Sequence, residues 1–240
     1  MENAPIPAPR IKKNARILLI SNMNTGPSKH NIQSKKEMIY DTLKNSNLIS
    51  EIIVTSIDSI KHFTEFSLSS YHCVIYDLLD HGCEIENPQK EIEKYIKNGG
   101  NIIVTHDHAN RLLDILGLKR VGDDKNKNKN KKKKTNINKI SHYNKVINVN
   151  FDHDIWKSYY NLENIKIMNI METHGKLYAS NKETKQVMHS YDNNNDLYLS
   201  TRNIGMGKAI FWNAGHTPNI NEEEKKLFLN MIAWVLKENN

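Results

Sequence analysis

The chain has 240 residues, which is the length of one large domain or of two small ones. Hydrophobic residues make up 38% of it, enough to bury a core, so a fibrous repeat and a chain disordered throughout are excluded. The sequence has no apolar run of about eighteen residues, so we expect no transmembrane helix, and residues 1–16 lack the apolar stretch of a signal peptide. The two cysteines, Cys73 and Cys83, do not make a disulfide scaffold, which is typical of a cytoplasmic protein.

The formal net charge of +7 comes from one short tract. Residues 119–145 hold eleven Lys and Arg against two Asp, a local charge of +9, so the rest of the chain carries −2. Within this tract, residues 123–139 form a low-complexity Lys/Asn run that is too polar to pack, and we expect a disordered insertion there. The insertion predicts weak, nonspecific and salt-sensitive anion binding; the alternative is a solvated insert without a role.

The N-terminal half predicts alternating strands and helices. Residues 1–15 are polar and Pro-rich, and we expect a flexible arm in front of a single domain over residues 16–238. The domain opens on a continuous apolar run, Arg16–Ser21, which is typical of a buried parallel strand. Similar runs at Glu51–Ile57 and Cys73–Asp77 predict a second and a third strand.

Helix signals separate these strands. Ser34 opens an S-x-x-E pattern, which is typical of a capping box at a helix start. A later helix begins at Asn87 and Pro88, as N-cap and first residue, and ends at the glycine pair that starts at Gly99. A fourth strand, residues 101–106, follows directly.

The C-terminal half predicts short strands and one helix. Four strand-like segments have the spacing of hairpins or of a meander at one sheet edge: Val146–Val149, Gly175–Ala179, Gln186–Ser190 and Asp196–Thr201. A turn at Gly205 leads into a strand that ends at Trp212, and Asn221 is the N-cap of a final helix. Together the elements predict an α/β three-layer sandwich with a mainly parallel central sheet, flavodoxin-like in the broad sense.

Polar and imidazole side chains follow four of the predicted strands. In open parallel sheets, ligands bind beyond the carboxyl ends of the strands, so we expect a ligand site at this edge. Its candidate residues are Asn22, Asn24, Asp80, His81, His106, His108, Gly215 and His216. If the site is catalytic, His106, Asp107 and His216 are the candidate acids and bases. The alternative is that these side chains are polar caps and loop hydrogen-bonders.

No motif predicts a cofactor or a dedicated nucleophile. His and Asp are suitable ligands for a divalent metal, but the sequence has no H-E-x-x-H or paired-Cys motif, so we predict no metal site and keep a divalent metal as an alternative. The sequence also lacks G-x-S-x-G, a Walker loop and a dinucleotide-binding fingerprint. Cys73 opens a buried strand and is expected to be inert, whereas Cys83 falls in a loop.

Several segments resemble a known fold family. The segment YIKNGGNIIVTH (residues 95–106) resembles the helix–Gly-Gly–strand–elbow unit of the class I glutamine amidotransferase-like fold, and more narrowly of its ThuA-like, trehalose-utilisation branch, in which a histidine often occupies the elbow. Three further segments agree in order: YHCVIYDLL (71–79) with the preceding strand, FDHDIW (151–156) with the family's His-Pro-Ile segment, where Asp154 replaces the proline, and GMGKAIFWNAGH (205–216) with its Gly-x-Gly and Gly-His ending.

The resemblance implies a fold and two classes of function. Amidotransferases of this fold need a cysteine at the elbow, but Thr105, His106 and Asp107 hold that place here, so glutamine hydrolysis is not expected. The missing nucleophile favours a non-catalytic binding or assembly module, with a protein partner or a second copy of the chain, and a cytoskeletal or ciliary assembly is then conceivable. The alternative is a pocket for a carbohydrate-like small molecule, or a hydrolase or isomerase that uses the strand-end histidines.

Overall fold

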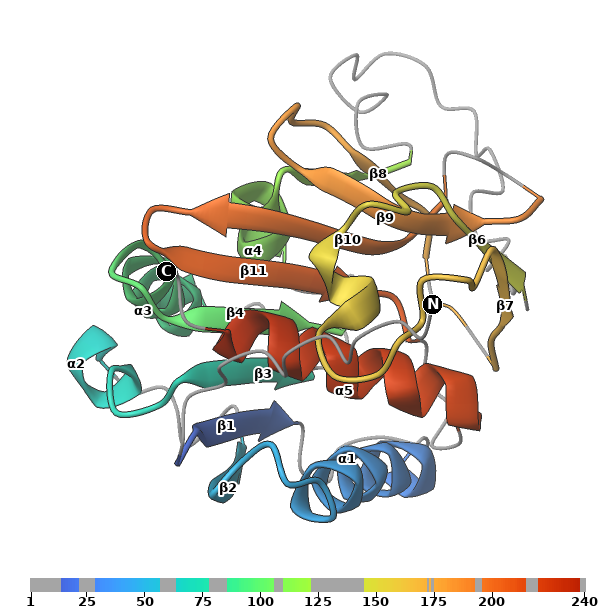
Figure 1. The fold of residues 1–240 in the computed structure, drawn as a ribbon. Coiled ribbons are helices and arrows are strands. Elements are labelled where there is room, and N and C mark those ends of the chain that lie inside the picture. The colour runs from blue at the N-terminus through green and yellow to red at the C-terminus, as the bar shows by residue number, and fades with distance from the viewer. Residues whose placement is uncertain are drawn as a thin grey trace, which may run out of the picture.

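A nine-stranded sheet lies between two layers of helices (Figure 1). In this computed structural model the described residues are 14–21, 29–56, 64–77, 86–105, 110–121, 145–171, 173, 175–192, 196–214 and 220–237. The predicted insertion and nearly all of the predicted N-terminal arm lie outside these residues and stay predictions. In spatial order the sheet comprises β2 (Glu51–Ser56), β1 (Arg16–Ser21), β3 (Cys73–Asp77), β4 (Asn101–Val104), β11 (Gly207–Trp212), β10 (Leu197–Ile204), β9 (Lys185–Ser190), β6 (Lys145–Asn148) and β7 (Ile167–Asn169).

The sheet is mixed, which corrects the expectation of a mainly parallel one. The pairs from β2 through β1, β3 and β4 to β11 are parallel, and those from β11 through β10, β9 and β6 to β7 are antiparallel. Of the four segments expected to form hairpins or a meander at an edge, three overlap with β6, β9 and β10 and extend the same sheet into an antiparallel half, whereas Gly175–Ala179 contributes to a separate sheet. A second small sheet pairs β5 (Leu118–Arg120) with β8 (Leu177–Ala179).

The parallel half has the strand order β2-β1-β3-β4-β11. This order is the flavodoxin-like arrangement, in which the winding of the chain reverses between the first and third strands. In structures of this kind the reversal opens a crevice beyond the carboxyl ends of those two strands. The topology therefore marks the carboxyl ends of β1 and β3 as the place to look for a ligand site.

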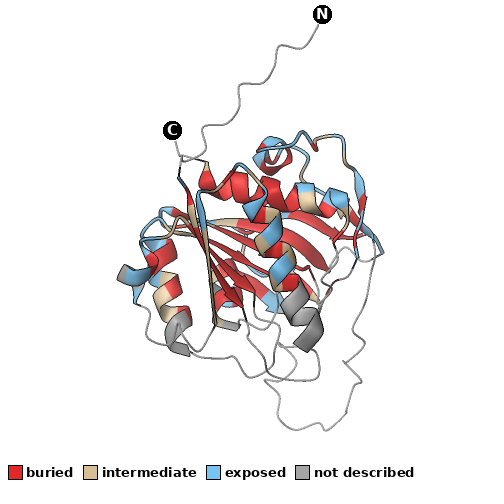
Figure 2. Cartoon of the chain, turned by 90° about the horizontal axis from the view of Figure 1, so that it is seen from below, coloured by how far each residue is buried: buried red, intermediate tan, exposed pale blue. Residues whose placement is uncertain are grey.

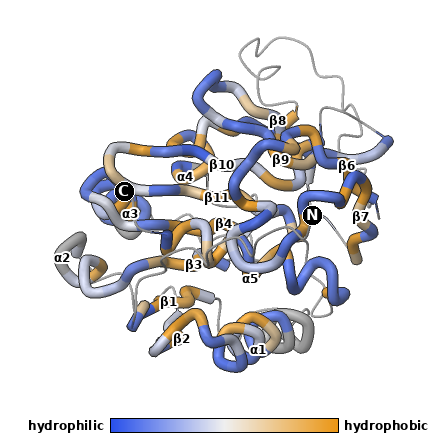
Figure 3. Tube along the Cα trace, viewed as in Figure 1, coloured by the Kyte–Doolittle hydropathy of each residue, from blue (hydrophilic) through white to orange (hydrophobic). Residues whose placement is uncertain are grey.

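Helices cover both faces of the sheet. One layer holds α1 (Lys29–Lys44), α5 (Glu222–Leu236) and the 3-10 helix η3 (Asp154–Lys157), and the other holds α2 (Glu65–Leu68), α3 (Glu86–Lys97) and α4 (Asn110–Leu116). Alternate strand residues face the two layers: Leu19 and Ile75 pack with α1 and α5, whereas Leu18 and Val74 pack with α3 and α4. Buried residues gather in the strands and on the helix sides that face them (Figure 2). Hydrophobic segments run along β1, β2 and β3 (Figure 3).

The helix boundaries follow some of the sequence signals and not others. The N-cap prediction for α5 is confirmed, because the Asn221 side chain accepts from Glu224 N and Glu224 Oε2 accepts from Asn221 N. The capping-box prediction at Ser34 is wrong, because α1 begins at Lys29 and Ser34 lies inside it. An S-x-x-E pattern makes a box only where the serine backbone leaves the helix, and the sequence does not show that. No helix in the described part of the chain is long and apolar enough to cross a bilayer.

Two glycine motifs meet at the end of α3. A Cβ on Gly207 would lie 2.1 Å from Gly100 O and 2.3 Å from Ile96 O, so the start of β11 packs directly on the backbone that follows α3. At Gly100 a Cβ would lie 2.2 Å from the ring of Tyr95. The hairpin turn before β11 is held there as well, since Met206 N donates to Lys97 O at 3.2 Å. The Gly-Gly and Gly-x-Gly motifs of the sequence therefore pack against each other in a single contact.

This contact predicts a strong effect of Gly207→Ala. The added methyl group meets backbone carbonyls that cannot rotate away, so we expect a loss of about 1–3 kcal/mol in the free energy of unfolding. Met206→Ala is the control, because Met206 is 69% exposed in the same turn and should change stability by less than about 0.5 kcal/mol. Urea unfolding of both variants measures this. Equal effects of the two substitutions would show that the close approach carries no strain.

Candidate functional site

A cluster of buried polar side chains lies at the carboxyl edge of the parallel half. Ser21 ends β1, Asp77 ends β3, Thr105 follows β4, and Lys35 reaches them from α1; all four are 0% exposed. Ser21 and Asp77 are register partners in neighbouring strands. By strand alternation they continue the face that packs against α1 and α5. The cluster therefore lies at the point where the winding of the chain reverses.

The two carboxylate oxygens of Asp77 have different surroundings. Lys35 Nζ lies 3.0 Å from Oδ1, and the Thr105 hydroxyl donates a short hydrogen bond to the same oxygen. Within the described part of the chain, Asp77 Oδ2 accepts no hydrogen bond, and Ser21 Oγ has no partner either. Most buried polar atoms in proteins are hydrogen-bonded, so two such oxygens on adjacent strands are an exception with a chemical meaning. Both atoms are buried, and they lie at the ends of neighbouring strands.

The Lys35–Asp77 pair also anchors α1 to the sheet. Moving two charges out of water is costly, and their mutual attraction offsets that cost only with good geometry and additional hydrogen bonds. Thr105 supplies such a hydrogen bond. Since the two charges cancel, the cluster is neutral overall.

The elbow of the amidotransferase-like motif holds no thiol. Thr105 stands at its start, and its hydroxyl is committed to Asp77. The prediction that Cys73 opens a buried strand is confirmed, and burial raises the pKa of its thiol far above the ordinary value, as expected for an unreactive cysteine. Cys83 lies outside the described residues.

The site residues named from the sequence all lie outside the described residues. These are Asn22, Asn24, Asp80, His81, His106, Asp107, His108, Gly215 and His216. Their roles stay predictions. In sequence, seven of them come after the strand ends that carry Ser21, Asp77 and Thr105, and Gly215 and His216 come after β11.

None of the four cluster residues is among the site residues named from the sequence, and Lys35 is the hardest of them to predict. A helical lysine is normally assigned to the solvent face. The available signal is its position four residues before Ile39 and eight before Leu43, both buried, which places Lys35 on the apolar stripe of α1. Among the described residues, no group of three or more His, Cys, Asp or Glu side chains comes close enough to hold a metal ion.

His153, in the FDHDIW segment, has a structural role. It is the N-cap of η3, where its Nδ1 accepts from Ile155 N at 3.2 Å. The other ring nitrogen therefore carries the proton and donates to Thr201 Oγ1 at 2.9 Å. Burial lowers the pKa of His153 to about 4, so the ring is neutral near pH 7.

The fold is similar to several solved structures. The cytoplasmic protein STM1381 of Salmonella typhimurium LT2 superposes with a TM-score of 0.63 at 12% identity, covering 92% of this chain and 100% of that one. A ThuA-like protein from Bacteroides uniformis gives a TM-score of 0.62 at 13% identity, covering 100% of this chain and 97% of that one. The β-galactosidase of Bacillus circulans sp. alkalophilus gives a TM-score of 0.57 at 11% identity, over 96% of this chain but 33% of that one.

These similarities concern the fold. The resemblance to ThuA-like proteins that the motifs indicate is confirmed at this level, since the ThuA-like protein aligns over the whole of this chain. This chain spans about a third of the β-galactosidase. The sequence matches no protein-family model and no curated protein.

The buried ion pair predicts non-additive effects on stability. Asp77→Asn removes the carboxylate that pairs with Lys35, and Lys35→Met removes the ammonium group that pairs with Asp77; each should cost about 3–5 kcal/mol in the free energy of unfolding. The double variant removes both charges and should recover roughly half of the summed loss. Lys94→Met, which breaks an exposed pair with Glu91, is the control and should cost less than about 1 kcal/mol. Urea unfolding in which the two single losses simply add would contradict a coupled pair.

The depressed pKa of His153 predicts a pH dependence of stability. The unfolded ring binds a proton near pH 6.5 and the folded ring near pH 4, so its contribution is complete above pH 6.5 and is lost as the pH falls towards 4. The loss is about 3 kcal/mol. His153→Asn keeps an N-cap acceptor without a titrating ring, and its stability should fall less over this range. Parallel pH curves for the two proteins, measured by urea unfolding, would show that His153 is not held neutral.

Proposed function

We propose that the chain is a non-catalytic ThuA-like domain that acts as a binding module. Its ligand is a neutral, hydroxyl-bearing small molecule, held at the carboxyl edge between β1 and β3. The observation that carries this proposal is the buried Asp77 carboxylate, with one oxygen bonded to Lys35 and Thr105 and the other without a partner in the described part of the chain. The strand order supports the same position, because ligands of flavodoxin-like sheets bind where the winding reverses.

The charges at this edge favour a neutral ligand. Lys35 already neutralises Asp77, so an ionic ligand would gain no net attraction and would lose its hydration. Asp77 Oδ2 needs a donor, and the Ser21 hydroxyl both donates and accepts. Two adjacent hydroxyl groups satisfy both atoms, which is the chemistry of a carbohydrate or another polyol. The ThuA-like resemblance implies the same class of ligand.

Binding without turnover follows from how Thr105 is held. A nucleophilic hydroxyl needs a base that can accept its proton. The Thr105 hydroxyl is buried and donates a hydrogen bond to Asp77 Oδ1, an oxygen that also pairs with Lys35, so this hydroxyl is held within the cluster. The competing function is a hydrolase or isomerase with His106, Asp107 and His216 as acid and base. This enzyme function is supported by the positions of the three residues in the sequence, since each comes shortly after the end of a strand.

Ser21→Ala tests the proposal against a matched control. Ser21 and Ser200 are both buried strand serines whose hydroxyl has no partner in the described part of the chain, but Ser200 lies in β10. Removing either unpaired hydroxyl should leave stability nearly unchanged. Calorimetric titration with glucose, galactose, maltose and trehalose should detect a ligand, and Ser21→Ala should weaken it roughly two- to tenfold while Ser200→Ala does not.

Three outcomes would contradict this function. The first is a protein that binds none of these sugars nor glycerol. The second is a Ser21→Ala variant that binds as well as the parent. The third is turnover of a bound sugar that His106→Ala or His216→Ala abolishes, which would establish the enzyme in place of the binding module.

A further inference from the structure

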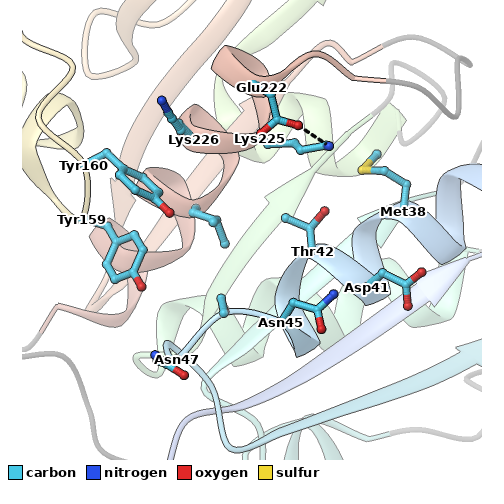
Figure 4. A pocket seen from close by; sticks show the side chains of 12 residues that line it. Met38, Asp41, Thr42, Asn45, Asn47, Tyr159, Tyr160, Glu222, Lys225 and Lys226 are labelled. Atoms are coloured by element: carbon cyan, nitrogen blue, oxygen red, sulfur yellow. Dashed lines mark hydrogen bonds and ion pairs between the residues drawn. The ribbon is translucent and has the colours of Figure 1, made fainter.

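A groove lies between α1 and α5, apart from the Asp77 cluster. It has a volume of about 490 Å³, and its walls are the second half of α1 with the turn after it, the first half of α5, and the segment after η3 (Figure 4). Tyr159 and Tyr160 form one lip. Their rings meet edge to face with centroids 4.8 Å apart, and they are 39% and 37% exposed. Two neighbouring aromatic rings are thus presented to solvent beside a hollow.

A buried amide fixes these tyrosines in place. Asn230 of α5 is 0% exposed, and its Oδ1 accepts from Tyr159 N at 3.2 Å and from Tyr160 N at 2.7 Å. Its Nδ2 donates to Tyr160 O at 2.9 Å and to Ile155 O at 2.7 Å. Every hydrogen-bonding site of this amide is used, three times on the backbone of the two tyrosines and once on η3. A pre-ordered backbone lowers the entropy cost of binding through the two rings.

The charges on the groove have a self-complementary pattern. Glu222 and Lys225 of α5 pair with each other at 2.6 Å. This leaves Asp41 on the α1 wall and Lys226 on the α5 wall (Figure 4). Within the described part of the chain neither forms an ion pair within 4 Å, although Lys226 also attracts Glu222 one turn before it. Opposite unpaired charges therefore stand on opposite walls.

We infer that this groove is an interface with a second copy of the chain. A two-fold axis through the groove places Asp41 of each copy opposite Lys226 of the other. The same pair of opposite charges then forms twice across the interface. The tyrosine lip of each copy then enters the groove of the other and forms the apolar centre of the contact. Tyrosine is enriched in the centres of such interfaces, where exposed rings become buried. The interface is independent of the sugar site, so either proposal can fail alone.

Charge reversal tests the interface on the full chain. Sedimentation equilibrium should show a concentration-dependent dimer for the parent. Asp41→Lys and Lys226→Asp should each weaken it at least roughly tenfold, because each places like charges opposite one another twice. The double variant should dimerise like the parent, since both pairs reform with reversed sign. An equimolar mixture of the two single variants should also dimerise. One variant then has a positive charge at both positions 41 and 226 and the other has a negative charge at both, so each contact joins opposite charges.

Two further variants complete the experiment. Tyr160→Ser should weaken the dimer without changing the unfolding midpoint by more than a few degrees, since the ring is partly exposed. Asp114→Lys reverses an exposed charge on α4, in the opposite helical layer, and should leave the dimer unchanged. A parent that stays monomeric at about 100 μM would overturn the inference. A dimer that the single charge reversals leave intact would also overturn it, because such a dimer would use another surface. A monomer that binds an unrelated protein through Tyr160 would overturn it as well.

Discussion

A buried carboxylate at the end of a central strand is the constraint on which the parallel half depends. Asp77 is fully buried at the end of β3, and a charge in that position is stable only with a partner and with hydrogen bonds. Lys35 and Thr105 meet this need from α1 and from the residue after β4. The position of α1 over the sheet is therefore tied to a charge as well as to packing. Both donors approach the same oxygen, and the other oxygen has no hydrogen-bond partner in the described part of the chain.

A second polar network joins α5 to the antiparallel half. Glu224 is buried in the first turn of α5, where it closes the capping box with Asn221 and accepts from Tyr198 Oη at 3.0 Å and from Met171 N at 3.2 Å. Trp212 Nε1 donates to the same Tyr198 hydroxyl at 2.9 Å. Burial raises the pKa of Glu224 despite these donors. The sequence predicts only a local N-cap here, but Glu224 of this cap also joins the helix to β10 and β11 through its hydrogen bonds. These bonds orient the face of α5 that carries the groove.

Much of the fold could be predicted from the sequence. The apolar runs that became β1, β3 and β11 are continuous, because both faces of these strands are buried, and such runs are easily recognised. The mixed character of the sheet could not be deduced, since pairing direction depends on contacts between segments far apart in the chain. The two glycine motifs were visible, but their contact with each other was not.

The candidate site was predictable in position and not in chemistry. The carboxyl edge follows from the strand pattern, and Asp77 and Thr105 are visible there as strand ends. Lys35 is not, because its role comes from a tertiary contact that lies 42 residues away in sequence. The sequence does not predict the groove, since Asn230 looks like an ordinary helix residue until its hydrogen bonds are known: three to the segment after η3 and one to Ile155 in η3.

The most direct test of the central claim is the environment of Asp77 Oδ2. Crystals grown with a neutral disaccharide and measured to about 1.5 Å would resolve the groups within hydrogen-bonding distance of this atom and of Ser21 Oγ. We expect a hydroxyl-bearing molecule that bridges the two oxygens, while Lys35 and Thr105 stay on Oδ1. A Ser21 hydroxyl that donates directly to Asp77 Oδ2, with no other molecule within hydrogen-bonding distance of either atom, would contradict the account.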